Sequence, residues 1–209
     1  MIRNHGSEKV LLMVLCLAMV WTGRAQGEKS AAAAPPVPIQ RLLQEVNAHF
    51  TVQGKPVHPR LVEKFQTFLS DSGPPAVITV DLLAATINGN EYYEPDVKVQ
   101  DGVVSVEHKD PEGSGFAYKW LGTVRPGLHV VETFASGGGT GVFMDLYFFR
   151  TSTATGQDEK GPYDEVLMTL ARTPVILGDR DDGTIKVEPG RVIIGKSRYR
   201  NQPVILEFK

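Results

Sequence analysis

Cysteine is almost absent from this chain of 209 residues, whose one cysteine, Cys16, lies near the N-terminus inside an apolar run. If the first 26 residues are removed during export, as argued below, the remaining chain has none. It then forms no disulfide, builds no thiolate metal site and has no cysteine nucleophile. An exported chain without disulfides depends on its hydrophobic core, which about 180 residues can supply as a single domain.

Long hydrophobic runs are also missing. The longest, VLLMVLCLAMVW, has 12 residues, well short of the roughly 20 that a membrane-spanning helix needs. Arg3 and Lys9 precede this run and small residues follow it. The arrangement predicts a secretory signal peptide over residues 1–26, and the small residues allow cleavage after Ala25 or after Gly27.

The chain has no large excess of charge. Without residues 1–26, the 22 basic and 24 acidic residues become 19 and 23, a net charge of −4. This balance favours solubility and gives no electrostatic argument for a nucleic-acid partner. There is no Asn-x-Ser/Thr sequon, which fits bacterial export. We expect a periplasmic or extracellular protein with no membrane span in its mature chain.

Residues 27–38, GEKSAAAAPPVP, contain small residues and prolines without apolar periodicity, and they predict a flexible linker. The single globular domain then covers residues 39–209. Apolar side chains at helical spacing predict a short helix over 39–46 and a second helix over 59–69. Between them, Gln53 and Gly54 indicate a small turn or hairpin.

From Ala76 onward the sequence is typical of short strands. About ten segments rich in β-branched and aromatic residues, from AVITVDLLAAT to PVILEF, are separated by Gly, Pro, Asp or Asn. The intervals leave no room for crossover helices, so we predict a mainly β fold, an antiparallel sandwich or open barrel with one or two helices near the N-terminus. Tight hairpins are expected at 100–102, 125–127, 181–183 and 188–190. The longest polar loop is expected at 151–164.

Local catalytic motifs are missing as well. There is no HExxH, no G-x-S-x-G and no S-x-x-K. His129 and Glu132 would point to opposite faces of a regular strand, which disfavours a local His-Glu pair. Catalytic groups can still meet from distant positions. We therefore lean towards no enzyme activity and expect no cofactor and no metal.

Three glycines in a row stand in SGGGTG, residues 136–141. Their backbone N–H groups could converge on an anion, so the loop is a candidate binding site. A P-loop would require Lys and Ser/Thr followed by a helix, whereas a strand follows here. We favour a wide hairpin loop. The candidate ligand-binding residues of this loop are Gly137, Gly138, Gly139 and Thr140.

An acidic loop, LGDRDDGTIKV, resembles a calcium loop in composition but not in register. If Gly183 takes the invariant glycine position, Arg180 and Gly178 fall where carboxylates should be. A strand turn is the simpler interpretation, and calcium bound in another geometry stays a hypothesis. The candidate residues of this loop are Asp179, Arg180, Asp181 and Asp182.

Two further patterns are a basic stripe and an aromatic stripe. Lys196, Arg198 and Arg200 would share one face if GKSRYR were extended, which suits the outer face of an edge strand or a grip on an anionic polymer. Phe116, Tyr118 and Trp120 alternate in GFAYKWLG, so a strand would place all three on one face. A core face is the default, and a platform for a sugar ring or a protein partner is the alternative.

Together these patterns favour an exported β domain that acts by binding, with an envelope protein or a polysaccharide as its partner. The main alternative is a hydrolase of an envelope polymer whose carboxylates, such as Asp145 and Asp179, come from separate strands and loops. A third possibility is a structural domain within an assembly. The oligomeric state does not follow from the sequence.

Overall fold

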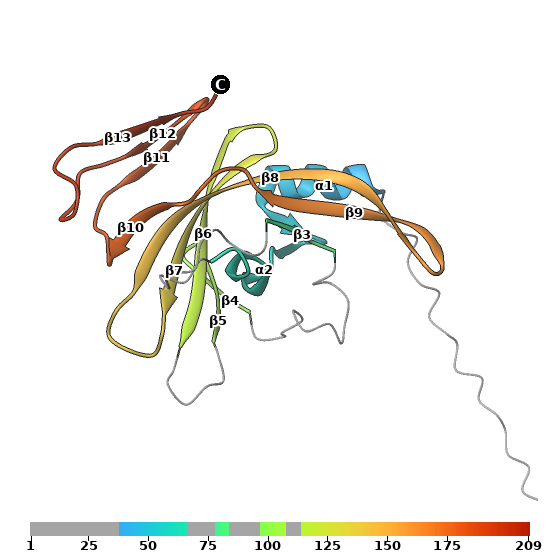
Figure 1. The fold of residues 1–209 in the computed structure, drawn as a ribbon, viewed down its shortest axis with the longest axis horizontal. Coiled ribbons are helices and arrows are strands. Elements are labelled where there is room, and N and C mark those ends of the chain that lie inside the picture. The colour runs from blue at the N-terminus through green and yellow to red at the C-terminus, as the bar shows by residue number, and fades with distance from the viewer. Residues whose placement is uncertain (1–37, 67–77, 84–96, 108–113) are drawn as a thin grey trace, which may run out of the picture. The chain divides into compact units, whose positions relative to one another are not determined.

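An antiparallel sheet of eight strands organises the structure (Figure 1), a computed structural model that describes residues 38–66, 78–83, 97–107 and 114–209. The strand order is β3-β9-β8-β7-β6-β5-β4, and β10 pairs with the part of β8 that β9 leaves free. The strands are β3 (Thr79–Asp81), β4 (Lys98–Gln100), β5 (Val103–Glu107), β6 (Gly115–Arg125), β7 (Leu128–Ser136), β8 (Phe143–Asp158), β9 (Gly161–Leu170) and β10 (Val175–Asp179).

Two helices and a small hairpin cover one face of this sheet. They are α1 (Ile39–His49), β1 (Thr51–Val52), β2 (Lys55–Pro56) and α2 (Pro59–Glu63). Leu42 and Val46 form the buried stripe of α1. The helix ends at Phe50, whose φ of 55° is left-handed and whose N–H donates to the Val46 carbonyl at 2.8 Å. This conformation is costly for a non-glycine residue, and burial of the Phe50 ring offsets the cost.

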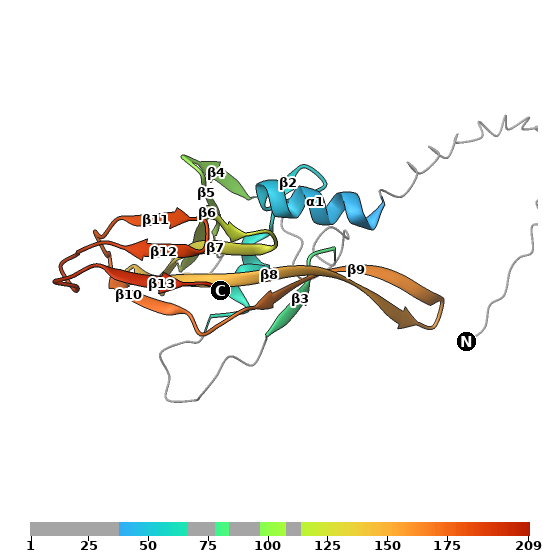
Figure 2. The same ribbon diagram turned by 90° about the horizontal axis from the view of Figure 1, so that it is seen from above.

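A three-stranded sheet covers the other face. It consists of β11 (Ile185–Glu188), β12 (Arg191–Ile194) and β13 (Val204–Glu207), in that order. Figure 2 shows the three strands side by side, with β13 as an outer strand. β11 lies next to β6 of the larger sheet.

The core therefore has two layers, one on each face of the larger sheet. Along β8, Tyr147 and Phe149 pack towards the helices, whereas Leu146 and Phe148 pack towards the small sheet. Alternate side chains of a strand point to opposite faces, so a strand covered on both sides has to be apolar throughout. This explains the unbroken run LYFF and confirms the prediction of a mainly β, sandwich-like fold.

Three local predictions are wrong. Residues 151–164 are not a loop, because β8 and β9 continue as a paired ladder to Asp158 and Gly161. Residues 181–183 are not a tight hairpin, because β10 and β11 belong to different sheets. The second predicted helix ends at Glu63, and its residues 67–69 lie outside the described residues. The hairpins at 100–102, 125–127 and 188–190 are confirmed.

The described residues belong to one unit that begins at residue 36. The predicted signal peptide, and all but the last residue of the predicted linker, lie outside them. Within the described part of the chain, neither helix has the length and apolar character needed to cross a membrane.

Candidate functional site

The aromatic stripe of β6 lies against the helices. Phe116 and Tyr118 are 2% and 1% exposed, and the Tyr118 hydroxyl donates to the Val57 carbonyl at 2.5 Å. Trp120 is half-buried and stacks on Phe50, with ring centroids 6.4 Å apart and planes 9° apart. This burial favours the core interpretation and leaves Phe116 and Tyr118 unavailable to a ligand at the surface.

His129 is a buried polar group of the same layer. Its Nε2 lies 3.1 Å from the Thr151 hydroxyl, and that hydroxyl donates to Asn47 Oδ1 at 2.6 Å. The hydroxyl has a single proton, so it accepts from His129, and Nε2 must carry the imidazole proton. Burial lowers the pKa of His129 to about 4. The ring is therefore neutral at pH 7 and ties β7 through β8 to α1.

His129 and Glu132 point to opposite faces of β7, as predicted. The register pairs His129 with Phe149 on the helix face and Glu132 with Leu146 on the small-sheet face. Burial raises the pKa of Glu132, and nearby Lys119 partly opposes that effect. The two side chains thus belong to separate layers and form no local pair.

The glycine-rich loop 136–141 joins β7 to β8 as the expected wide hairpin. Gly137, Gly138, Gly139 and Thr140 are exposed. Gly138 has a φ of 87°, which favours glycine. A Cβ added at Gly137 or Gly139 would meet nothing within 4 Å. At these two positions, crowding by the protein does not explain the choice of glycine.

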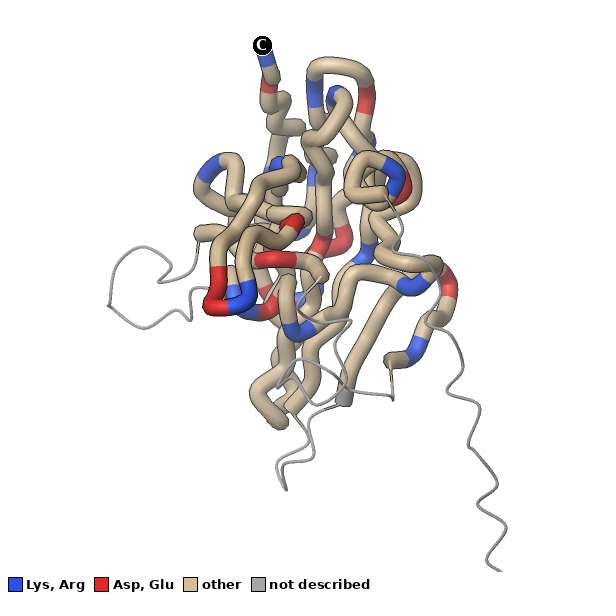
Figure 3. The backbone as a smooth tube through the Cα atoms, turned by 90° about the vertical axis from the view of Figure 1, so that its right-hand side faces the viewer, with Lys and Arg blue, Asp and Glu red and all other residues tan. Residues whose placement is uncertain are grey.

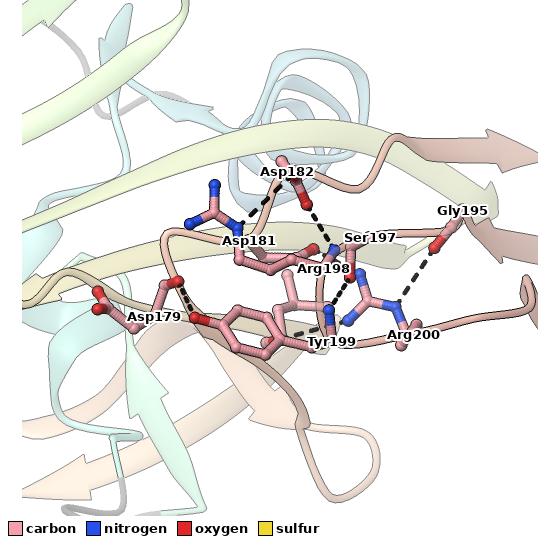
Figure 4. A network of polar contacts seen from close by, with 9 residues as sticks. Asp179, Asp181, Asp182, Gly195, Ser197, Arg198, Tyr199 and Arg200 are labelled. Carbon is pink, nitrogen blue, oxygen red and sulfur yellow. Dashed lines mark hydrogen bonds and ion pairs between the residues drawn. The ribbon is translucent and has the colours of Figure 1, made fainter.

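The acidic loop and the basic stripe, treated separately in the sequence, meet in one polar network (Figure 4). Arg200 Nη2 lies 2.5 Å from Asp181 Oδ2, and Arg198 Nε lies 3.6 Å from Asp182 Oδ2. The Tyr199 hydroxyl donates to the Asp179 carbonyl at 2.7 Å. The network connects the end of β10 to the turn between β12 and β13.

Arg200 is the centre of this network. Besides its contact with Asp181, it donates to the carbonyls of Gly195 and Leu177, each at 3.3 Å. The Asp181 side chain is 1% exposed, so its charge depends on Arg200 for compensation. A Cβ at Gly183 would lie 2.6 Å from Arg200 Nη2. A side chain at this position would displace the Arg200 guanidinium from its contact with Asp181, which favours glycine here without a calcium loop.

The ion pairs Arg198–Asp182 and Arg180–Asp179 are exposed. Hydrogen bonding from the Arg198 backbone N–H lowers the pKa of Asp182. Asp179 Oδ1 accepts the Val142 N–H at 2.8 Å, while its Oδ2 lies 3.4 Å from Arg180 Nη1. The chain's own donors thus contact all three carboxylates. No group of three or more His, Cys, Asp or Glu side chains in the described ranges is placed to hold a metal ion.

The basic stripe does not lie along a strand. Ser197 and Arg200 exchange two backbone hydrogen bonds, of 3.0 and 3.1 Å, which close a tight turn. Arg198 and Arg200 then contact different aspartates, so the predicted common face of an extended GKSRYR is wrong. In the view of Figure 3, Lys and Arg positions are interspersed with Asp and Glu positions along the described backbone.

Asp145 and Asp179, the carboxylates named for a hydrolase, lie on neighbouring strands. Asp145 pairs with Ile176, and Asp179 with Phe143. Burial raises the pKa of Asp145, which is a property of general acids. However, both oxygens of Asp179 are engaged by Val142 and Arg180. Asp179 therefore contacts the chain's own donors through both of its oxygens.

A different surface feature emerges at β13. Val204 and Ile205 are 40% and 55% exposed, and among the described strands only β12 pairs with β13. The sequence predicted a strand at PVILEF, but nothing in it indicated an edge position. That position depends on which strands pair across the sheet.

The direction of the backbone groups of β13 follows from its ladder. The Phe208 N–H donates to the Gly190 carbonyl on the β12 side. Backbone groups alternate in direction along an antiparallel strand. Those of Leu206 and Val204 therefore also point to β12, while the N–H and C=O of Ile205 and Glu207 point to the free edge. This exposed row of donors and acceptors can hydrogen-bond an added strand.

No protein-family model, no curated protein and no solved structure matches this chain.

Proposed function

We propose that this chain is an exported, non-catalytic binding protein of the cell envelope, and that its partner is another protein that adds an extended segment to β13. The free edge of β13, with exposed apolar side chains at Val204 and Ile205, carries this proposal. Strand addition supplies backbone hydrogen bonds for affinity and side-chain contacts for specificity.

The other edges carry features that discourage strand addition. β4 is three residues long and carries Lys98, and β3 is equally short and carries Asp81. β10 has a register shift between Ile176 and Gly178. Short length, charge and bulges are the usual protections of sheet edges. β11, the other edge of the small sheet, also keeps a regular register with β12, but it lies next to β6 and carries Lys186 and Glu188. β13 keeps a regular register with β12 over all four of its residues, so among these edges it is the one best suited to receive a strand.

The export part of the proposal rests on the signal-like segment at residues 1–26, with its basic start and 12-residue apolar run. The two core layers contain no cysteine, so the exported protein can fold without forming a disulfide. A protein partner is preferred to a polysaccharide because Phe116 and Tyr118, which would have stacked on sugar rings, are buried.

The test is capture from envelope extract with three tagged forms of the full chain. Ile205→Pro removes an N–H that points to the free edge of β13. Val99→Pro is the matched control, because Val99 is 59% exposed and its N–H points to the free edge of β4. Ile205→Lys is a second variant that leaves the β12 ladder intact.

We expect the wild-type chain and Val99→Pro to capture the same stoichiometric protein, and both Ile205 variants to lose it. Circular dichroism and melting curves check that each variant is folded. Equal capture by all forms would place the partner elsewhere. Retention of the wild-type chain on a polysaccharide, without a protein, would favour the sugar-binding alternative.

A further inference from the structure

The outer face of the small sheet, which points away from the core, carries two rows of side chains across its strands. One row consists of Glu188, Arg191 and Glu207, and the other of Lys186, Ile193 and Ile205. Each row ends at the free edge of β13. The next residue of each row would come from the added strand.

The charged row ends at Glu207, which lies opposite Arg191 in the register but forms no ion pair with a described side chain. Arg191 Nη2 lies 2.6 Å from Glu188 Oε2, and Arg191 Nε donates to the same oxygen at 2.7 Å. Lys186 Nζ also contacts Glu188, at 2.5 Å. Among the described side chains no cation forms an ion pair with Glu207, which is exposed. Two cations thus form ion pairs with Glu188, whereas the Glu207 carboxylate at the edge remains available.

Building on the proposed function, we infer that the strand added to β13 carries Lys or Arg beside Glu207 and an apolar, β-branched residue beside Ile205. Cross-strand neighbours of opposite charge and apolar pairs both stabilise antiparallel sheets. The two positions lie on the same face, so they are two residues apart in the partner. The partner segment therefore has the pattern basic, any residue, apolar, in either chain direction.

A second copy of this chain fits the edge less well. In the antiparallel register that pairs Ile205 with its own copy, Glu207 lies opposite Pro203, which has no N–H to donate to the ladder. In the register that pairs Glu207 with its own copy, like charges face each other. A partner segment with its own cation can place a favourable neighbour beside both Ile205 and Glu207, whereas self-pairing does so for one of them at most.

The test selects peptides from a random displayed library of twelve-residue sequences on the full chain. We expect enrichment of Lys or Arg two residues from Val, Ile or Thr. Enriched peptides should bind the Glu207→Lys variant about three- to tenfold more weakly, because an attraction between opposite charges becomes a repulsion between like charges. Selection on Glu207→Lys should enrich Asp or Glu at the same position.

Glu159→Lys is the matched control, because Glu159 is exposed at the β8–β9 turn and its reversal changes the net charge equally. It should leave peptide binding unchanged. If the peptides bind Ile205→Pro and Ile205→Lys as well as the wild type, they do not use β13, and the proposed function fails with the inference.

Two other outcomes separate the inference from the proposed function. The peptides could depend on Ile205 and yet show no preference for Lys or Arg, or show a preference that selection on Glu207→Lys does not reverse. Either result would overturn the inference and leave the proposed function standing. Self-association of the wild-type chain that Ile205→Lys abolishes, measured by light scattering after gel filtration, would assign the edge to a second copy and overturn the inference.

Discussion

Asp181 and Arg200 form a buried ion pair between the acidic loop after β10 and the turn that follows β12. Asp181 Oδ2 and Arg200 Nη2 lie 2.5 Å apart, and the side chains are 1% and 14% exposed. Two segments that looked like separate candidate sites in the sequence thus neutralise each other inside the fold.

Loss of Arg200 should therefore be costly. Arg200→Ala leaves the Asp181 carboxylate buried without its counter-charge, and we expect the free energy of unfolding to fall by about 3–5 kcal/mol. The matched change Arg198→Ala removes a half-exposed partner of Asp182 and should cost far less stability, because exposed ion pairs are screened by solvent. Urea unfolding of both variants measures the difference, and equal losses would argue against a stabilising role for burial of the pair.

Stability should fall in mild acid because of His129. Its pKa is lowered from 6.5 to about 4 in the folded protein, so between these values the unfolded chain binds a proton that the folded chain does not. The contribution of His129 to stability is complete above pH 6.5 and decreases as the pH falls to about 4. The full loss is about 3 kcal/mol, at 1.36 kcal/mol for each pKa unit.

Urea unfolding between pH 7.5 and pH 4 checks this, with His129→Phe as the variant that cannot titrate. Burial raises the pKa of Asp81, Glu132 and Asp145, which acts in the opposite direction. The difference in pH dependence between wild type and variant isolates the histidine. Parallel curves would mean that His129 titrates normally in the folded protein.

Trp120 should report a core environment. In the Trp21→Phe chain it is the sole tryptophan. Its Nε1 is buried and its ring stacks on Phe50. We expect blue-shifted emission, weak quenching by iodide, and no response to peptidoglycan fragments or common polysaccharides. Emission like that of free tryptophan, with quenching that a sugar prevents, would restore the binding-platform interpretation.

Calcium should have no effect on the melting temperature. Asp179, Asp181 and Asp182 each contact an arginine of the chain itself, so an added cation would have to displace these partners. Melting curves with calcium chloride and with EDTA should coincide. A lower melting temperature in EDTA would show that the acidic loop binds a cation despite its internal pairs.

Much of the β architecture could be predicted because its strands are short, apolar and separated by turn residues. The β8–β9 ladder could not, because TSTATGQD is polar. Its one available signal was the alternation of β-branched Thr151, Thr153 and Thr155, which suits a strand whose exposure increases towards the β8–β9 turn. Polarity alone thus does not separate a loop from a strand whose side chains face solvent.

The candidate site was less predictable than the fold. GKSRYR contained the basic residues, but their partners stand 16 and 19 positions earlier in the chain, so the sequence indicated a charged stripe where the structure forms a turn. PVILEF was predicted as a strand. Its role as a free edge depends on long-range pairing, which local pattern does not encode.

The sequence by itself determined the strand-rich fold class, the short hairpins at 100–102, 125–127 and 188–190, and the opposite faces of His129 and Glu132, because these follow from local backbone preferences and the two-residue period of a strand. Only the tertiary structure decided that Phe116 and Tyr118 are core residues, that Asp181 meets Arg200, and that β13 has a free edge. Each depends on which distant segment covers a given face or edge, and that is set by the packing of the whole chain.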